Sequence, residues 1–195
     1  MVSIKPNLTN NSGNKMISRK LIISIHLTLA AFFAPILLII GISGGLYLIG
    51  VKGSVQSEQI YQGATTNFDF QAKDQESQIR QFIQANDIDH EFEYVKTSGR
   101  TSYTRPTSRQ HLTFQKEGDQ LTVNKRTPNL VASMIELHKG HGPTILKTFQ
   151  QLTAIGFFLI LISGLYLGIT SPAFKNKTLL ISGLGLLSFL IFAVI

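Results

Sequence analysis

The chain has 195 residues, a formal net charge of +7 and no cysteine. Disulfides, cysteine-ligated zinc, iron–sulfur clusters and a covalent C-x-x-C-H haem are therefore excluded. Hydrophobic residues make up 44% of the chain and concentrate in three stretches, 21–51, 145–170 and 178–195. This concentration predicts an α-helical membrane protein.

The excess positive charge lies beside the apolar stretches. Residues 1–20 hold four basic residues and no acidic one, two lysines lie in the loop 171–177, and Lys147 is the seventh. Residues 51–146 carry equal numbers of basic and acidic residues, so nucleic-acid binding has no support. Because positive residues favour the cytoplasmic side, we expect the N-terminus inside and the segment between the first two spans outside. Lys147 opposes this orientation only weakly, since one lysine can snorkel.

The apolar stretches predict three membrane helices around one outside domain. The first stretch is near twice the roughly 7–15 residues of a signal-peptide core, which favours a retained helix over a cleaved signal, and Pro35 is expected to kink it. The third stretch is at the lower limit for a span, so a full span and a half-buried helix both stay open. The predicted boundaries are a cytoplasmic basic tail 1–20, helix 21–51, a domain 52–143, helix 144–170, a cytoplasmic loop 171–177 and helix 178–195.

The segment 52–143 predicts a small α+β domain. Its first part, 52–73, is polar and indicates a linker followed by a short strand at Phe68 and Phe70. Gly140 suits the end of one helix and Pro143 the first turn of the next, which predicts a hinge before the second span. Capping residues and periodicity predict the other elements: helix 74–86, strands 90–96, 109–115 and 120–125, a hairpin turn at 117–119, and helix 129–138.

A short motif recurs in the three apolar stretches. The segment Ile162–Leu167 reads ISGLYL, Ile42–Leu48 reads ISGGLYL, and Ile181–Leu184 reads ISGL. Small residues let helices approach closely, so helix packing within or between chains is the favoured interpretation. Substrate transport through unwound glycine segments is the alternative. The glycines concerned are Gly41, Gly44, Gly45, Gly164, Gly168 and Gly183.

Three features together point to a known family. A basic pair precedes His26 in the first span, Leu-His-x-Gly-x-Gly occupies 137–142, and the second span closes in Ser-Gly-Leu-Tyr at 163–166. Over roughly 19–170 the chain resembles the PepSY-associated transmembrane helix (PepSY-TM) proteins of bacterial inner membranes. The resemblance implies a periplasmic PepSY-like domain. Larger relatives include membrane reductases implicated in siderophore-iron uptake, which carry b-type haem on membrane histidines; this chain has fewer spans than they have.

The resemblance makes His26, His138 and His141 candidate haem b ligands. The alternatives are an interfacial polar residue at His26 and a solvated hinge at the other two. Axial nitrogens on one iron lie about 4 Å apart, whereas His26 and His141 are expected at opposite membrane faces, roughly 30 Å apart. His138 and His141 are too close along the hinge to take opposite faces of one haem. A bis-histidine haem would therefore need a second subunit, for instance His26 facing the same histidine of a second copy.

No other chemistry is indicated. The sequence contains no nucleophile–base constellation, phosphate loop or zinc motif, so no catalytic or metal-binding residue is assigned and an enzyme is disfavoured. Four acidic residues at 87, 89, 91 and 93 flank His90, and a solvated strand edge is favoured over a cation site. An ordinary charged surface is likewise favoured over a basic patch for Arg100, Arg105, Arg109, Lys125 and Arg126.

The predicted function follows from these observations. We expect a multi-pass inner-membrane protein that acts as an accessory or interaction protein and presents its PepSY-like domain to the periplasm. Its expected partners are the lipid bilayer and either a membrane or periplasmic protein or a second copy of the chain. The alternative is a haem b electron-transfer subunit linked to ferric-siderophore reduction and iron uptake.

Overall fold

The structure, a computed structural model, describes residues 18–64 and 74–195. It divides into two compact units, Phe32–Phe157 and, separately, Met1–Ala31 with Phe158–Ile195. In chain order the elements are α1 (Arg19–Leu48), β1 (Val55–Ala64), α2 (Gln75–Ala85), β2 (Tyr94–Ser98), β3 (Thr101–Arg105), β4 (His111–Glu117), β5 (Gln120–Pro128), α3 (Leu130–His138), α4 (Thr144–Ile169) and α5 (Lys175–Val194).

Three helices of the described residues are long and apolar enough to cross a membrane. They are α1, α4 and α5, with 30, 26 and 20 residues and mean hydropathies of 2.4, 2.2 and 2.0. A helix satisfies its own backbone hydrogen bonds, which is what a segment surrounded by lipid requires. The predicted class, a helical membrane protein with a small α+β domain between its first two spans, is confirmed.

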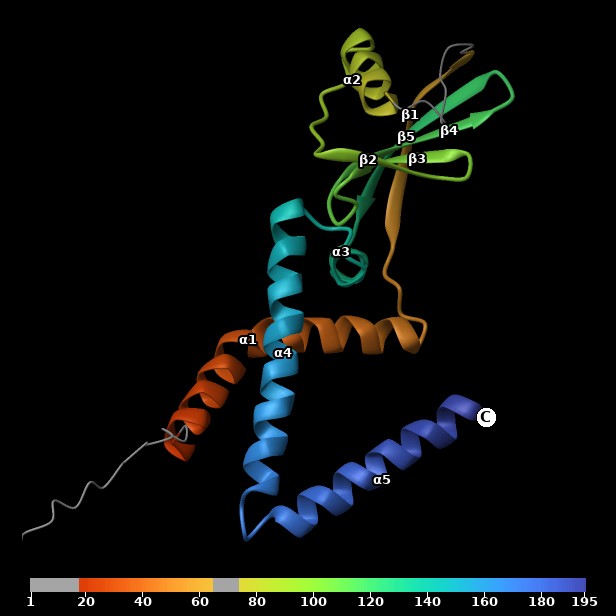
Figure 1. The fold of residues 1–195 in the computed structure, drawn as a ribbon. Coiled ribbons are helices and arrows are strands. Elements are labelled where there is room, and N and C mark those ends of the chain that lie inside the picture. Colours follow the sequence, from red (N-terminus) through yellow and green to blue (C-terminus); the bar gives the residue numbers. More distant parts are fainter. Residues whose placement is uncertain (1–17, 65–73) are drawn as a thin grey trace, which may run out of the picture. The chain divides into compact units, whose positions relative to one another are not determined.

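The five strands of the described residues form one antiparallel sheet in the order β1-β5-β4-β3-β2 (Figure 1). Alternation along β4 and β5 turns their apolar residues to one face, where helix α2 covers them. The ring of Phe82 contacts two other aromatic rings edge to face. Its centroid lies 4.9 Å from that of Tyr61 and 5.7 Å from that of Phe114. The buried core consists of Ile79, Ile83, Phe92, Leu112, Phe114, Leu121 and Val123.

The opposite face of the sheet is polar. In the β4–β5 pairing His111 lies across from Arg126, and in the β3–β4 pairing Tyr103 lies across from Thr113. Arg105, two residues beyond Tyr103, shares this face because side chains repeat every second residue along a strand. Helix α3 follows β5 directly and contributes two buried apolar residues, Ala132 and Ile135. The polar face of the sheet and α3 together build the cleft described below.

Two predictions about the domain were wrong. The interval 52–73, predicted to begin as a linker, contains the ten-residue strand β1, which pairs with β5. Most residues of β1 are exposed because it is an edge strand, so it lacks the alternation that marks a half-buried strand. The polar strand β3 was not predicted at all. The strand expected at Phe68 and Phe70 lies outside the described residues.

The acidic run before β2 also differs from expectation. The predicted strand 90–96 begins only at Tyr94, so residues 87–93 precede the sheet and do not form a solvated strand edge. Asp87 has a positive φ of 52°, a conformation that short polar residues tolerate. The helix predicted at 74–86 is α2, the helix predicted at 129–138 is α3, and the hairpin turn lies between β4 and β5 as predicted.

The hinge between α3 and α4 is built by standard helix-end hydrogen bonds. Gly140 has a φ of +74°, and its N–H donates to Leu137 O while the N–H of His141 donates to Glu136 O, both at 2.9 Å. This is the Schellman pattern, which favours glycine at the left-handed position. The pattern fixes His141 beside the last turn of α3 and next to Glu136.

Candidate functional site

His26 lies against the Ser-Gly pair of α4. Its Nδ1 is 2.9 Å from Ser163 Oγ, and a Cβ added at Gly164 would lie 3.2 Å from the ring. Ser163 donates its only proton to the backbone carbonyl of Leu159 at 2.6 Å. The serine oxygen therefore accepts from Nδ1–H of His26. With the serine proton on a carbonyl of its own helix, Nε2 of His26 carries the free lone pair.

His138 lies in the same way against the Ser-Gly pair of α1. Its Nδ1 is 3.2 Å from Ser43 Oγ and 3.1 Å from the carbonyl oxygen of Ile40, and a Cβ added at Gly44 would lie 3.1 Å from its ring. A carbonyl only accepts, and Ser43 also donates to Ile40 O at 3.1 Å, so the proton of His138 is on Nδ1. The Nε2 of His138 again carries the lone pair.

The two histidine pockets explain part of the repeated motif. In ISGG of α1 and ISG of α4, the serine binds an imidazole and the following glycine leaves room for the ring. A Cβ at Gly168 would meet the side chain of Thr178, with Oγ1 at 2.6 Å. Cβ atoms at Gly41, Gly45 and Gly183 would meet nothing within 4 Å among the described residues. The motif therefore has at least two uses, histidine contact and close helix contact.

Cavities accompany both histidine pockets. In the unit that contains His26, a groove of about 860 Å³ lies between α1 and α4, is lined mainly by aliphatic side chains, and includes Arg19 and Ser163. In the other unit, two smaller cavities of about 250 and 280 Å³ are both lined by Ser43 and His138. His138 therefore lines two largely apolar cavities itself, whereas the groove in the other unit is lined by Ser163, which binds His26, and not by His26.

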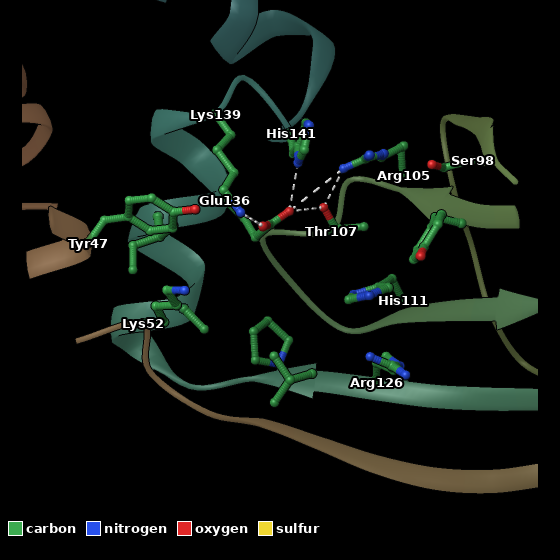
Figure 2. A pocket seen from close by; sticks show the side chains of 15 residues that line it. Tyr47, Lys52, Ser98, Arg105, Thr107, His111, Arg126, Glu136, Lys139 and His141 are labelled. Carbon is green, nitrogen blue, oxygen red and sulfur yellow. Dashed lines mark hydrogen bonds and ion pairs between the residues drawn. The ribbon is translucent and has the colours of Figure 1, made fainter. Parts of the chain in front are cut away.

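His141, the third candidate ligand, belongs to a different cluster. Its Nδ1 lies 2.8 Å from Glu136 Oε2, to which Thr107 also donates at 2.6 Å. Lys139 pairs with the other carboxylate oxygen at 3.0 Å, and an Arg105 Nη1 lies 3.7 Å away (Figure 2). Burial alone would raise the pKa of Glu136, but the hydrogen bonds from Thr107, His141 and Lys139 outweigh it and lower the pKa to about 2. Glu136 is therefore an ionised centre that ties α3 to the hinge and the sheet.

This cluster forms one wall of a cleft of about 460 Å³ on the polar face of the sheet. His111 and Arg126 lie side by side on neighbouring strands in its floor (Figure 2). Tyr47, in the last turn of α1, and Lys52, which follows that helix, line it from another side. His111 Nδ1–H donates to Arg109 O at 2.9 Å. Burial, and then nearby Arg126 and Arg105, lower the pKa of His111.

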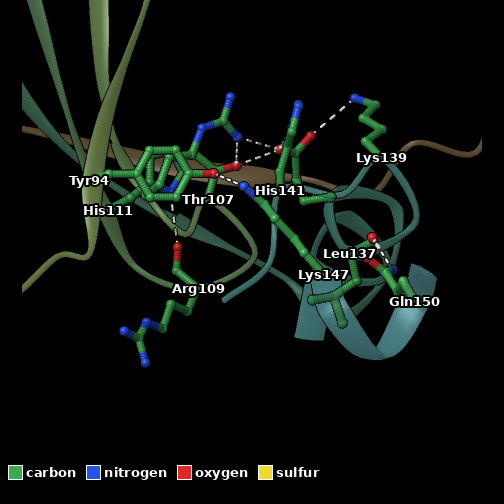
Figure 3. A network of polar contacts seen from close by, with 11 residues as sticks. Tyr94, Thr107, Arg109, His111, Leu137, Lys139, His141, Lys147 and Gln150 are labelled. Carbon is green, nitrogen blue, oxygen red and sulfur yellow. Dashed lines mark hydrogen bonds and ion pairs between the residues drawn. The ribbon is translucent and has the colours of Figure 1, made fainter. Parts of the chain in front are cut away.

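The first turn of α4 is held by the sheet domain. Glu93 accepts hydrogen bonds from Thr144 N at 2.8 Å and Thr144 Oγ1 at 2.7 Å, so it caps the helix from outside. These hydrogen bonds from Thr144, backbone first, lower the pKa of Glu93. Lys147 donates to the hydroxyl of Tyr94 and lies over its ring (Figure 3). The predicted snorkelling lysine thus anchors α4 to β2.

The described residues contain no group of three or more His, Asp or Glu side chains that could hold a metal ion. His90, in the middle of the acidic run, instead contacts Thr104 Oγ1 at 3.0 Å through Nε2 and stacks near Phe92. Of the predicted basic residues, Arg105 is buried in the Glu136 cluster and Arg126 lies in the cleft. The set is therefore not a uniform exposed surface.

Comparison with known proteins agrees with this architecture. The family model for the PepSY-associated TM region matches residues 23–186. The chain belongs to this family. No curated protein and no solved structure matches it. The match spans both histidine pockets and the whole sheet domain of this PepSY-associated membrane protein.

Ser43 and Ser163 are the site residues that sequence reasoning did not assign. The echo between the two spans was visible, but it was interpreted as helix packing, with substrate transport as the alternative. The sequence does not show that Ser43 contacts His138, 95 residues away, or that Ser163 contacts His26, 137 residues away. A sequence without its fold offers no reason to join residues at such separations.

Proposed function

We propose that this PepSY-associated membrane protein is a haem b-binding electron-transfer subunit linked to ferric-siderophore reduction. The single observation that carries the proposal is the state of His26 and His138. The Nδ1–H of His26 donates to α4, and the Nδ1–H of His138 donates to α1. The Nε2 of each ring forms no hydrogen bond with the described residues. Metal-ligating histidines characteristically donate their second ring N–H to a fixed acceptor in this way. Haem b, when bound, supplies one-electron chemistry.

The residues around His26 and His138 suit the binding of haem b. Ser163 and Ser43 fix the orientation of each ring, and the adjacent glycines leave space for it. The aliphatic groove near Ser163 suits the apolar face of a porphyrin, and Arg19 at the same groove suits a propionate carboxylate. The third candidate, His141, also has its Nδ1 on a fixed acceptor, Glu136, but the cleft that it lines is polar and rich in cations, which does not suit a porphyrin.

Each pocket would offer one histidine nitrogen to a haem, so a bis-histidine site would need another from a second copy or a partner subunit. This requirement agrees with the exposure of α5, of which no residue is buried among those that the structure describes. A helix that is apolar on all sides has faces for lipid and for other helices. The proposed electron-transfer unit is therefore an oligomer or a complex.

The test is the reduced-minus-oxidised spectrum of the purified chain from haem-replete cells. We expect b-type Soret and α bands, and we expect His26→Ala and His138→Ala each to remove about half of the bound haem if both pockets are used. His90→Ala is the matched control, because His90 lies in the sheet domain and contacts Thr104. A colourless preparation, or equal haem loss in all three variants, would refute the proposal.

A second candidate function is the accessory role predicted from the sequence, in which the sheet domain and exposed helices bind a partner protein. The exposed α5 favours it independently of haem. Crosslinking in intact membranes tests it, with photoreactive residues placed separately at Leu187 on α5 and at Glu117 in the sheet domain, and with a sample that is not irradiated as the control. A specific adduct at α5 from a colourless protein supports this role, and the absence of any adduct contradicts it.

The proposed orientation has the N-terminus in the cytoplasm and the sheet domain in the periplasm of a bacterial inner membrane. It rests on the basic residues of 1–20 and on Lys175 and Lys177, which lie in the first turn of α5. Fusing a periplasm-active reporter after Gly118 should give active protein, whereas fusion after Asn176 should not. An inactive first fusion with an active second one would reverse the orientation.

A further inference from the structure

The cleft on the polar face of the sheet has more positive than negative charge. Its lining includes Lys52, Arg105, Arg126 and Lys139, but Glu136 is the one carboxylate among the described residues that line it. This carboxylate is already engaged by Lys139, His141 and Thr107, with Arg105 nearby. A single anion cannot balance four cations, so positive charge is left over in the cleft.

The surplus is carried by two side chains. Neither Lys52 nor Arg126 forms an ion pair with any acidic residue in the described part of the chain. The Nε of Arg126 is buried and has no hydrogen-bond partner among the described residues. Buried polar groups are nearly always paired in folded proteins, so this donor points to an acceptor that the chain does not itself provide.

The chemistry of that acceptor follows from the guanidinium. The Nε–H and a neighbouring Nη–H of arginine form one edge of a planar fork, which matches two oxygens of a phosphate or carboxylate. Lys52 adds a second positive charge with three donors. Two unneutralised cations around a cavity of about 460 Å³ favour a doubly charged or multi-oxygen anion with an attached organic group over a lone carboxylate.

His111 is the group in the cleft that would report such a ligand. It lies across from Arg126 in the β4–β5 register, and Arg105 of β3 and Glu136 of α3 are the other charged groups that act on it. His90 interacts with it by charge, and Arg109 of its own loop contributes only a backbone carbonyl. Its Nδ1–H donates to Arg109 O, so Nε2 is open to protonation. An anion bound in the cleft would favour the protonated ring and raise the pKa of His111.

We propose that the cleft binds a phosphate-type oxyanion through Arg126, Lys52 and His111. The ligand is either a soluble phosphate ester or the headgroup of an anionic phospholipid. A headgroup has access because Tyr47 is on the last turn of the candidate span α1 and Lys52 follows it by a few residues. Tyr47 also lies under Lys52, with the ammonium 5.3 Å from its ring centroid. This site is independent of the two histidine pockets and of haem.

The experiment uses the full chain in nanodiscs, with two ligand arms. In phosphatidylcholine nanodiscs, glycerol 3-phosphate is titrated by calorimetry while the pKa of His111 is followed by NMR of its labelled ring. In the second arm, phosphatidylglycerol replaces part of the lipid and no soluble phosphate is added. We expect saturable binding and a rise in the pKa of His111 in at least one arm. A response to glycerol 3-phosphate identifies a soluble ester, and a response to phosphatidylglycerol alone identifies a headgroup.

Variants separate a site from general attraction to charge. Arg126→Gln should weaken binding about tenfold or more, because it removes a charge-assisted pair of hydrogen bonds. Arg100→Gln is the matched control, since Arg100 is exposed on the β2–β3 turn. Lys52→Gln, also at an exposed position, tests the site should Arg126→Gln fail to fold. Equal weakening in Arg100→Gln and in the cleft variants, or no saturable binding in either arm, would overturn the proposal.

Discussion

Replacing Glu136 by glutamine should loosen the junction between α3, the hinge and the sheet. The carboxylate holds Thr107, Lys139 and His141 by direct hydrogen bonds and lies 3.7 Å from Arg105. Its pKa is about 2 against an ordinary 4.5, and at about 1.4 kcal/mol per pKa unit this difference corresponds to about 3 kcal/mol. The side chain is 22% exposed, so solvent screening lowers the expected loss to about 2 kcal/mol.

The pH dependence of this loss has a definite sign. A carboxyl group whose pKa is lowered on folding stabilises the fold above its unfolded pKa and loses this contribution as the pH falls through its folded pKa. This contribution to the difference between wild type and Glu136→Gln should therefore be constant above about pH 5 and shrink toward zero near pH 2. Burial lowers the pKa of His90 in both proteins, so its contribution cancels in the difference. Burial also lowers the pKa of His111, but the charge of Glu136 partly raises it, so losing this charge adds destabilisation of the variant at mildly acidic pH.

Hydrogen exchange measured by mass spectrometry on the full chain in detergent provides the assay at pH 7. Amides of α3 and of the hinge should lose protection equivalent to about 2 kcal/mol, while those of α2 should change less. The pH dependence is tested by the free energy of unfolding in urea at pH 7 and pH 3, followed through the spectroscopic signal of the β-strands. Glu91→Gln, at an exposed position before β2, is the matched control. Unchanged protection in Glu136→Gln, or a difference that stays the same at pH 3, would show that the carboxylate is not the centre of the junction.

Three further outcomes are expected. Glu93→Gln should weaken the cap of α4 and increase exchange of the Thr144 amide by about fivefold to tenfold, whereas an unchanged rate would mean that the hydrogen bonds are dispensable. Gly44→Ala should displace the ring of His138 and lower haem retention in the spectral assay, whereas Gly41→Ala, whose Cβ would meet nothing within 4 Å, should not. Phe114→Ala should cost about 3–5 kcal/mol in urea unfolding of the sheet domain because the side chain is 0% exposed, and a cost below 1 kcal/mol would contradict the assigned core.

Local sequence patterns were sufficient to predict the elements that are marked by hydrophobic length, periodicity, or capping and turn residues. Spans are recognised because about 20 apolar residues in sequence have few other stable environments. Helix α3 was predictable from its periodicity and from Asn129, whose side chain accepts a hydrogen bond from Ala132 N. The β4–β5 hairpin was predictable from alternation on both sides of Gly118, whose φ is +60°. In contrast, β1 has no such signal, since an edge strand exposed along most of its length obtains its hydrogen bonds from β5 and not from its own pattern.

The sequence by itself therefore determined the membrane class, the α+β insert, the family and the three histidines worth considering. Only the tertiary structure decided what those histidines contact, because hydrogen bonds such as Ser163 to His26 join residues 137 positions apart. It also separated His141 from His138, three residues away, since the Schellman turn directs one toward Glu136 while the other remains on α3 facing Ser43. The positively charged cleft could not be predicted from the sequence, because the segment 51–146 is neutral as a whole. The charge of a site depends on which side chains the sheet brings to one face, and the pairing of β4 with β5 decides this.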